Sequence, residues 1–362
     1  MKDICFITDP LVTTIGAVRP ALLLLDEFQK RGCNVTLLSP YVSGEIKHMM
    51  ERKGIEVKSL NRRAHIIKWL PTFEAWLCSL FKRESLILRG DSIVINTSSC
   101  LKAYSHVYYA QGPMTKALDD MIPEMPMRYK YAYILSSPAL KYAEKRLIKE
   151  FRQLSNLFIA NSKFCASMYE GMNVKVDGVI YPSLNCGLFK PTTLKPSEDY
   201  LLTYFGVYSK ETKFLVIKKV ADNGVKIKAF GSKVPYVPRY ILKHPNISFL
   251  SKVSDEDLVN LYSNALYTLF VFNHEPFGYV PVESMACGTP VLTYNRQGPS
   301  ESVIDRVTGW LANNDEELVK LAVKIWRDGY PRWMRVKCRE RALEFDVKAI
   351  ANKWYELIKR NL

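Results

Sequence analysis

The chain has 362 residues, 48% of them hydrophobic, and a formal net charge of +15. This length and apolar content exclude a disordered chain and predict about two globular domains, each with its own core. No apolar run approaches the roughly 20 residues that a membrane span needs, and the N-terminal segment lacks the layout of a signal peptide. The positive charge predicts an anionic partner: a nucleotide diphosphate, a lipid phosphate, an acidic membrane surface or a nucleic acid.

Eight cysteines are scattered along the chain without a C-x-x-C pair. This distribution argues against a disulfide framework and against a zinc site. We therefore expect reduced, mostly buried cysteines in a cytoplasmic protein.

The N-terminal half begins with a strand–loop–helix–strand pattern. Buried strands are predicted at residues 4–7 and 35–38, on either side of a helix over residues 18–31 that ends at Gly32. This pattern is typical of a doubly wound parallel sheet. The first loop lacks a G-x-G-x-x-G turn, which argues against a nicotinamide dinucleotide site.

Residues 61–83 interleave Lys and Arg with Trp69, Phe73, Trp76 and Phe81. A basic, aromatic, amphipathic segment of this kind suits docking in a membrane interface. The same pattern suits an ordinary helix pair packed on the sheet, because core helices also carry aromatic residues. The sequence leaves both interpretations open.

Later strands are predicted at residues 92–96, 106–109, 157–160, 201–205, 225–230, 247–250 and 266–272. The helix predicted over residues 128–152 carries seven Lys/Arg against two acids, which usually marks a solvated face. A proline-rich polar linker at residues 191–197 separates the two halves. Asp255 and Asp257 form an Asp-x-Asp at the start of a helix, where acids complement the helix dipole and need no metal.

The most informative stretch runs from residue 274 to residue 301. Pro281 suits the first turn of a short helix, Gly288 suits its C-terminal exit, and the apolar residues 290–292 indicate a buried strand. Glu275 should then lie on a loop facing the helix N-terminus, with Glu283 inside the helix. The helical N–H groups favour a phosphate-bearing ligand, and the two carboxylates would accept hydrogen bonds from sugar hydroxyls at its two ends.

This stretch resembles the C-terminal signature of retaining GT-B glycosyltransferases of family 4, which combines Glu-x7-Glu, a Phe-Gly after the first Glu, and Ala-x-Gly-x-Pro-Val. The matching residues are Glu275, Phe277, Gly278, Val280, Glu283, Ala286, Gly288, Pro290 and Val291, and Gly298 and Glu301 fit a later Gly-x-x-Glu element. The resemblance covers essentially the whole chain.

The resemblance implies an α/β fold of GT-B architecture, with two Rossmann-like doubly wound parallel-sheet domains facing a cleft. It places an acceptor-side domain at residues 1–185 and a nucleotide-sugar donor domain at residues 198–340. The C-terminal helix, residues 341–362, would pack back on the first domain.

The resemblance also implies a donor site. Glu275 would hold sugar hydroxyls and Glu283 the ribose hydroxyls, and backbone contacts would come from Phe277, Gly278, Tyr279 and Val280. The family usually carries Gly-Arg at the end of the first donor-domain strand, with a Lys seven residues after the Gly. Here Gly206 is followed by Val207, so Lys213, with Lys210 as the second candidate, is expected to hold the diphosphate.

Two residues of the first half have weaker family counterparts. Gly16 stands where a glycine lets the backbone approach the donor diphosphate, although it would serve equally as a simple turn residue. Gln111 stands where many members have a histidine facing the reacting sugar. It could contact the sugar or the acceptor, or only cap a strand.

The implied activity is that of a retaining hexosyltransferase. It would move a sugar from a nucleoside-diphosphate donor to a glycan or lipid-linked acceptor, without a metal or another cofactor, in the cytoplasm or peripherally on the cytoplasmic face of a membrane. One alternative is a nucleotide-sugar epimerase or a phosphorylase on the same fold. The other is a basic protein that binds nucleic acid or an anionic membrane through a degenerate cleft. We see no recognised nucleic-acid module in the sequence, which disfavours nucleic acid as the partner.

Overall fold

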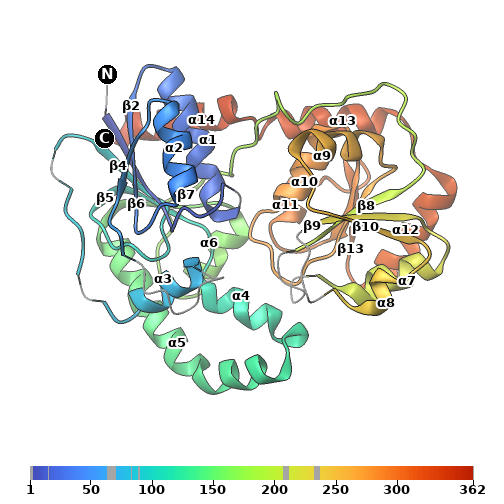
Figure 1. The fold of residues 1–362 in the computed structure, drawn as a ribbon, viewed down its shortest axis with the longest axis horizontal. Helices are drawn as coiled ribbons and strands as arrows, with labels where there is room; N and C mark the ends of the chain where they lie inside the picture. The colour runs from blue at the N-terminus through green and yellow to red at the C-terminus, as the bar shows by residue number, and fades with distance from the viewer. Residues whose placement is uncertain are drawn as a thin grey trace. The chain divides into compact units, whose positions relative to one another are not determined.

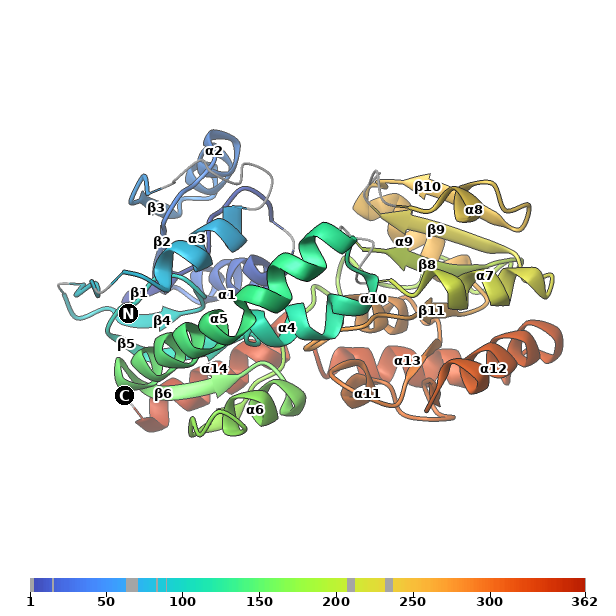
Figure 2. The same ribbon diagram turned by 90° about the horizontal axis from the view of Figure 1, so that it is seen from below.

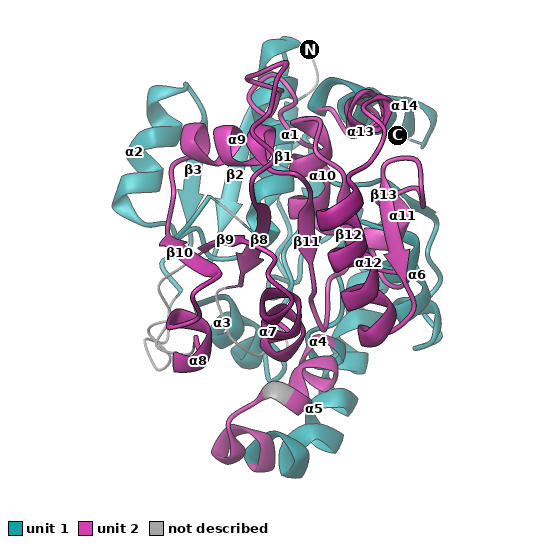
Figure 3. Cartoon of the chain, turned by 90° about the vertical axis from the view of Figure 1, so that its right-hand side faces the viewer, with its two compact units in different colours: residues 1–116, 132–183, 347–362 teal, residues 117–131, 184–346 magenta. Residues whose placement is uncertain are grey.

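The computed structural model describes residues 3–14, 16–62, 71–82, 84–88, 90–206, 212–231 and 237–361. The chain forms two compact units (Figure 3): unit 1 comprises residues 1–116, 132–183 and 347–362, and unit 2 comprises residues 117–131 and 184–346. The division differs from the sequence-based boundaries in three ways. The short segment 117–131 groups with unit 2, and unit 2 begins at residue 184, where the sequence-based donor domain begins at residue 198. Unit 2 also extends to residue 346, because the last helix begins at Val347.

Unit 1 is built, in its described residues, on seven parallel strands in the order β3-β2-β1-β4-β5-β6-β7 (Figure 1). The strands are β1 (Asp3–Ile7), β2 (Asn34–Ser39), β3 (Glu56–Ser59), β4 (Ile93–Asn96), β5 (Ser105–Ala110), β6 (Ser155–Ala160) and β7 (Gly178–Val179). The order reverses between β1 and β4, and crevices at such reversals are where doubly wound sheets bind ligands. The predicted parallel sheet is confirmed.

Alternate residues of these strands face opposite layers of helices, as the two-residue period of a strand requires. Ile4 and Phe6 belong to one core cluster with α1, α2 and α14, whereas Tyr108 and Phe158 belong to another with α3, α5 and α6. The helices of unit 1 are η1 (Gly16–Val18), α1 (Arg19–Lys30), α2 (Gly44–Arg52), α3 (Pro71–Ser79), α6 (Lys163–Glu170) and α14 (Val347–Asn361). Three further helices include residues of the segment 117–131 that groups with unit 2: α4 (Met114–Met121), η2 (Ile122–Glu124) and α5 (Met127–Gln153).

The C-terminal helix α14 lies in unit 1 beside α1. Trp354 is fully buried and meets Tyr109 edge to face, with ring centroids 5.2 Å apart. The Arg31 guanidinium donates to the Asn352 side chain at 2.7 Å and to the Lys348 carbonyl at 3.2 Å. These contacts join the end of the chain to its first helix.

The basic aromatic stretch 61–83 is described only in part. Trp76 is 1% exposed and lies in the core cluster of α3, α5 and α6, with Phe73 packed against it. The described helix α3 therefore packs on the sheet and does not present its tryptophan to a membrane. Trp69 lies outside the described residues.

Unit 2 has six parallel strands in its described residues, in the order β10-β9-β8-β11-β12-β13. The strands are β8 (Leu201–Phe205), β9 (Ile227–Gly231), β10 (Ile247–Ser251), β11 (Thr268–Phe270), β12 (Val291–Tyr294) and β13 (Gly309–Ala312). The reversal lies between β8 and β11. The loops that follow these two strands begin near Gly206 and Asn273, so they start at the same edge of the sheet.

The helices of unit 2 are α7 (Phe214–Asp222), α8 (Arg239–Leu242), α9 (Asp255–Asn264), α10 (Tyr279–Ala286), α11 (Pro299–Ser302), α12 (Asp315–Asp328) and α13 (Trp333–Leu343). Helices α7 and α12 share one core cluster, and α10 contacts α9, α11 and α13. Asp255 and Asp257 lie in the first turn of α9, which Ser254 caps, as the sequence predicts.

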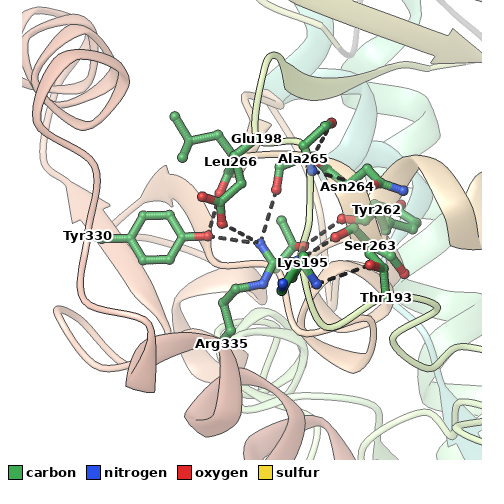
Figure 4. A network of polar contacts seen from close by, with 12 residues as sticks. Thr193, Lys195, Glu198, Tyr262, Ser263, Asn264, Ala265, Leu266, Tyr330 and Arg335 are labelled. Carbon is green, nitrogen blue, oxygen red and sulfur yellow. Dashed lines mark hydrogen bonds and ion pairs between the residues drawn. The ribbon is translucent and has the colours of Figure 1, made fainter.

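Arg335 of α13 connects the end of α9 with the turn that follows α10 (Figure 4). Its guanidinium donates to the carbonyls of Ser263 and Ala265, at 2.5 and 3.2 Å, and to the Thr289 hydroxyl at 3.0 Å. Thr289 comes directly after Gly288, whose φ of 79° ends α10 in the predicted way. The network thereby fixes the exit of the helix that carries Glu283.

Candidate functional site

Glu275 lies on the loop that follows β11, at the switch point of the unit 2 sheet. The strand residues before it are buried, which fixes the start of the loop at the carboxyl edge of the sheet. Helix α10 begins four residues after Glu275, at Tyr279. The predicted arrangement, a loop carboxylate facing a helix N-terminus with Glu283 inside the helix, is present in the structure.

The carboxylate of Glu275 is held by the backbone just after it. Its Oε1 accepts hydrogen bonds from the N–H groups of Gly278 at 3.1 Å and Phe277 at 3.4 Å. Burial raises the pKa of this carboxyl, and the two backbone hydrogen bonds and the nearby His274 imidazole offset part of that rise. Within the described residues Oε2 accepts no hydrogen bond, so one carboxylate oxygen can accept from a ligand hydroxyl.

Gly278 makes this geometry possible. Its φ of 94° lies in the region that only glycine adopts without strain, and it turns the chain from the loop into α10. A Cβ at this residue would also lie 3.1 Å from the Pro299 side chain. In the first turn of α10, Tyr279 and Val280 present N–H groups that have no acceptor inside the helix, at its positive dipole end.

Gln297 clamps the Glu275 loop from the next strand connection, and sequence reasoning missed it. Its Oε1 accepts the Glu275 N–H at 2.8 Å, and its Nε2 donates to the Asn273 carbonyl at 3.0 Å. Gln297 has a φ of 60°, an uncommon conformation for a residue with a side chain. The hydrogen bond joins two residues that are 22 apart in sequence. No local pattern in the sequence predicts that a glutamine before a Gly-Pro pair makes such a contact.

Gly298 brings the two connections together. Its N–H donates to the Glu275 carbonyl at 3.1 Å, and a Cβ there would lie 2.2 Å from the Pro276 carbonyl oxygen. The backbone at Pro276 comes so close to Gly298 that a residue with a side chain does not fit there, which explains the glycine of the Gly-x-x-Glu element.

Glu283 is buried in α10, with 5% of its surface exposed. Its Oε2 accepts a hydrogen bond from the Tyr262 hydroxyl at 3.1 Å. The helical position is the predicted one, and a contact with ribose hydroxyls stays a prediction.

Lys213 has an internal partner. Its ammonium lies 2.7 Å from Asp315 Oδ1 and 4.8 Å from the centroid of the Tyr294 ring. Burial alone would raise the pKa of Asp315, but hydrogen bonds from Lys213 and Tyr294 outweigh it and hold that pKa below its usual range. These groups line a surface hollow of about 540 Å³ together with Arg296, Asn313, Asn314 and Glu316.

The two other residues expected near a diphosphate are less informative. Gly206 directly follows β8, and its N–H donates to the Thr212 hydroxyl at 3.2 Å. Lys210 lies outside the described residues.

In unit 1, Gly16 and Gln111 occupy loops at the carboxyl edge of the sheet. Gly16 has a φ of 73° at the start of η1, and open space where a Cβ would lie. Gln111 follows β5 and donates from Nε2 to the Thr97 carbonyl at 3.2 Å, which links the loops after β5 and β4. His106 is a strand residue whose Nδ1 accepts the Val94 N–H at 3.0 Å.

His274 is nearly buried, and its Nδ1 lies 2.8 Å from Asp120 Oδ2. Asp120 belongs to the segment 117–131 that groups with unit 2. The contact holds His274, the residue before Glu275, in place. The two residues are 154 apart in sequence, so no local pattern predicts the contact.

Among the described residues no group of three or more His, Cys, Asp or Glu side chains is arranged to hold a metal ion. The expectation of a site that works without a metal stays a prediction.

Comparison with known proteins identifies relatives of this chain. The model of the family described as glycosyl transferases group 1 matches residues 240–345. The chain is 30% identical over 245 residues to alpha-1,3/1,6-mannosyltransferase ALG2 of Mus musculus, an alignment that covers 57% of this chain and 59% of the relative. The aligned part is therefore less than two thirds of that protein.

Two solved structures have the same fold. One is Anabaena Alr3699/HepE in complex with UDP, with a TM-score of 0.69 and 16% identity over 99% of this chain and 100% of that chain. The other is WaaG, a glycosyltransferase involved in lipopolysaccharide biosynthesis, with a TM-score of 0.68 and 16% identity over 98% and 99%. These likenesses confirm the predicted fold of two parallel-sheet α/β domains.

The clamp predicts a local effect of Gln297→Gly. Glycine adopts the positive φ without strain, so global stability should change little, whereas the Glu275 N–H loses its acceptor. Amide hydrogen exchange at Glu275 should accelerate about tenfold, while the amides of β13 exchange as before. Unchanged exchange at Glu275 would show that the clamp does not hold the loop.

The buried carboxylate predicts that Glu275→Gln stabilises the protein at neutral pH. The pKa of Glu275 is raised in the folded state. The cost of burying its charge therefore appears as pH rises from the unfolded-state pKa, about 4.3 for a glutamate, through the folded-state value. The variant should therefore melt higher than the parent at pH 7.5, with a smaller gap at pH 4.5. Glu170→Gln, at an exposed acid at the end of α6, is the control. An equal gap at both pH values would contradict the account.

Proposed function

Because the chain has the GT-B fold and carries a domain of the glycosyl transferases group 1 family in residues 240–345, we propose that it transfers a sugar from a nucleoside-diphosphate sugar to an acceptor. The observation that carries the proposal is the Glu275 loop. It sets a carboxylate oxygen without a described partner beside the first turn of α10, at the switch point of the unit 2 sheet.

In this proposal the donor binds to unit 2 with its sugar at Glu275. Oε2 of Glu275 accepts hydrogen bonds from sugar hydroxyls, and Glu283 accepts from the ribose. The N–H groups of Phe277 and Gly278 already serve Glu275, so the backbone contacts expected of this loop fall chiefly to Tyr279 and Val280 in the first turn of α10.

The chemical step breaks the bond between the anomeric carbon and the diphosphate oxygen and forms a bond from that carbon to an acceptor hydroxyl oxygen. The acceptor proton passes to the departing phosphate oxygen, and the new bond keeps the anomeric configuration. Negative charge grows on the diphosphate. The helix N-terminus, with Lys213 or Lys210, stabilises that charge, which is the kind of preorganised electrostatics that dominates many enzymes.

We propose a glycan or lipid-linked acceptor, handled by unit 1, where Gln111 offers an amide at the carboxyl edge of the sheet. One relative supports this class, since the protein that is 30% identical over 245 residues is named a mannosyltransferase. The chain would act in the cytoplasm, at an anionic membrane surface on that side. The net charge of +15 supports such a surface.

The proposal is tested by Glu275→Ala in an assay with nucleotide sugars and a lipid-linked acceptor. We expect at least a hundredfold loss of transfer, because one preorganised polar contact at the reacting sugar is worth about that much. Glu170→Gln, at an exposed acid at the end of α6, is the control and should transfer like the parent. Full activity of Glu275→Ala would overturn the assignment, and an inverted anomeric configuration in the product, read by NMR, would overturn the retaining mechanism.

A second pair of variants tests the role of Lys213. If its ammonium binds diphosphate, the nucleotide must compete with Asp315 for it. Lys213→Ala should then weaken nucleotide binding about tenfold or more, whereas Asp315→Asn should strengthen it, because the competing carboxylate is gone. If calorimetry shows equal nucleotide affinity in both variants and the parent, Lys213 is structural, and Lys210→Ala becomes the variant to measure.

A further inference from the structure

Helix α5 is the long green helix of Figure 2. It carries a stripe of exposed apolar side chains. Leu135 is 87% exposed and Tyr142 is 74% exposed. Successive helical residues are rotated by about 100°, which places the exposed apolar residues of the stripe within an arc of about 100°. We call this set the α5 stripe: Met127, Tyr131, Ile134, Leu135 and Tyr142.

The stripe is separate from the face by which α5 is held. Leu147, Ile148 and Phe151 are buried in the cluster that includes α3 and β6. Earlier in the helix, Tyr133 is buried, and its hydroxyl donates to the Thr115 carbonyl at 3.0 Å. The packing of α5 is thus satisfied without the stripe, and exposed apolar groups gathered in this way mark a contact surface.

The exposed surface of α5 carries mainly positive charge. Seven Lys/Arg stand in the helix against two acids, and both acids have partners inside the protein. Glu144 is 2% exposed and accepts from the Met114 N–H at 2.7 Å and the Thr115 N–H at 3.0 Å. Glu150 pairs with the Lys102 ammonium at 2.7 Å.

The helical rotation puts these basic residues along the stripe. Arg128 and Arg146 border it on one side and Lys130 and Lys141 on the other, at about 100° per residue. Lys145 and Lys149 continue the line of the stripe toward the end of the helix. The surface is therefore apolar and aromatic along its centre and basic around its edges.

A neighbouring element adds one more exposed aromatic residue. Arg146 Nη2 donates to the Leu80 carbonyl at 3.0 Å, which holds the end of α3 against α5. The next residue, Phe81, is 75% exposed. Phe81, which follows the end of α3, thus adds an exposed aromatic side chain near the Arg146 edge of the α5 stripe.

We propose that the α5 stripe docks in the headgroup interface of an anionic lipid bilayer, with α5 lying in the membrane plane. Tyrosine and aliphatic side chains would enter the boundary of the acyl chains while the bordering Lys and Arg meet lipid phosphates. Among the described residues no helix has the length and apolar content to cross a bilayer. The inference deepens the proposed function, since it supplies the surface on which a lipid-linked acceptor would be met.

The first test is co-sedimentation of the full chain with phosphatidylcholine vesicles, with and without phosphatidylglycerol. The parent should bind the anionic vesicles, and more weakly at high salt. Leu135→Ser/Tyr142→Ser should weaken that binding about tenfold or more, since two large apolar side chains leave the interface. The control, Leu194→Ser/Leu215→Ser, removes two leucines of unit 2 that are 94% and 65% exposed, and it should bind like the parent.

A charge pair separates lipid phosphate from simple apolar adhesion. Lys145→Gln/Lys149→Gln should weaken binding to anionic vesicles only, and Lys320→Gln/Lys324→Gln, the same spacing on α12, should not. The proposal is overturned if the parent stays in the supernatant, or if the Leu135/Tyr142 variant binds like the parent. It is also overturned if the parent forms a dimer that this variant abolishes, because the stripe would then be covered by a second copy.

Vesicle binding is measured without nucleotide, and nucleotide binding without vesicles. A Leu135→Ser/Tyr142→Ser variant that binds nucleotide like the parent but leaves the vesicles supports docking by the α5 stripe. A parent that binds vesicles but no nucleotide would leave the docking surface in place and remove the proposed transferase activity.

Discussion

The carboxylate of Glu275, held in a backbone frame, is the group on which the rest of the site depends. Taking a carboxylate out of water is costly unless hydrogen bonds replace its hydration, and the N–H groups of Phe277 and Gly278 do so. They point at the carboxylate because Gly278 turns the chain into α10 with a positive φ. The pKa of Glu275 is still raised, because these hydrogen bonds only partly compensate for the hydration that the carboxylate loses on burial. The hydrogen bonds to Glu275 thus place a buried carboxyl group beside the N-terminus of α10, at a cost in folding stability.

The parallel sheet of unit 2 supplies the geometry of that frame. Glu275 follows β11, Gly206 follows β8 and Gln297 follows β12, so three connections leave the same edge of the sheet. Gln297 and Gly298 join two of them directly. On the other side of α10, the Arg335 network fixes the turn into β12. The loop is therefore positioned from both of its flanking strands and through the helix that follows it.

Much of this fold follows from local signals in the sequence. Short buried runs mark the strands, Ser254 marks the start of α9, and Gly288 marks the end of α10. The missed features depend on contacts between distant residues. The Gln297 clamp and the partner of Lys213, which is 102 residues away, leave no periodic trace in the chain. Trp76 shows a related limit, since an aromatic residue in a basic segment suits a core and a membrane equally well, and only packing decides.

Calorimetric titration of the full chain with UDP, GDP and ADP, with and without a chelator, tests the central claim most directly. The account predicts that one of these nucleotides binds at a single site and that the chelator leaves its affinity unchanged. At about 100 times its dissociation constant this nucleotide should stabilise the protein by roughly 2.7 kcal/mol. If none of the three binds, or if binding requires a divalent metal, the donor site built around Glu275 and the first turn of α10 is contradicted.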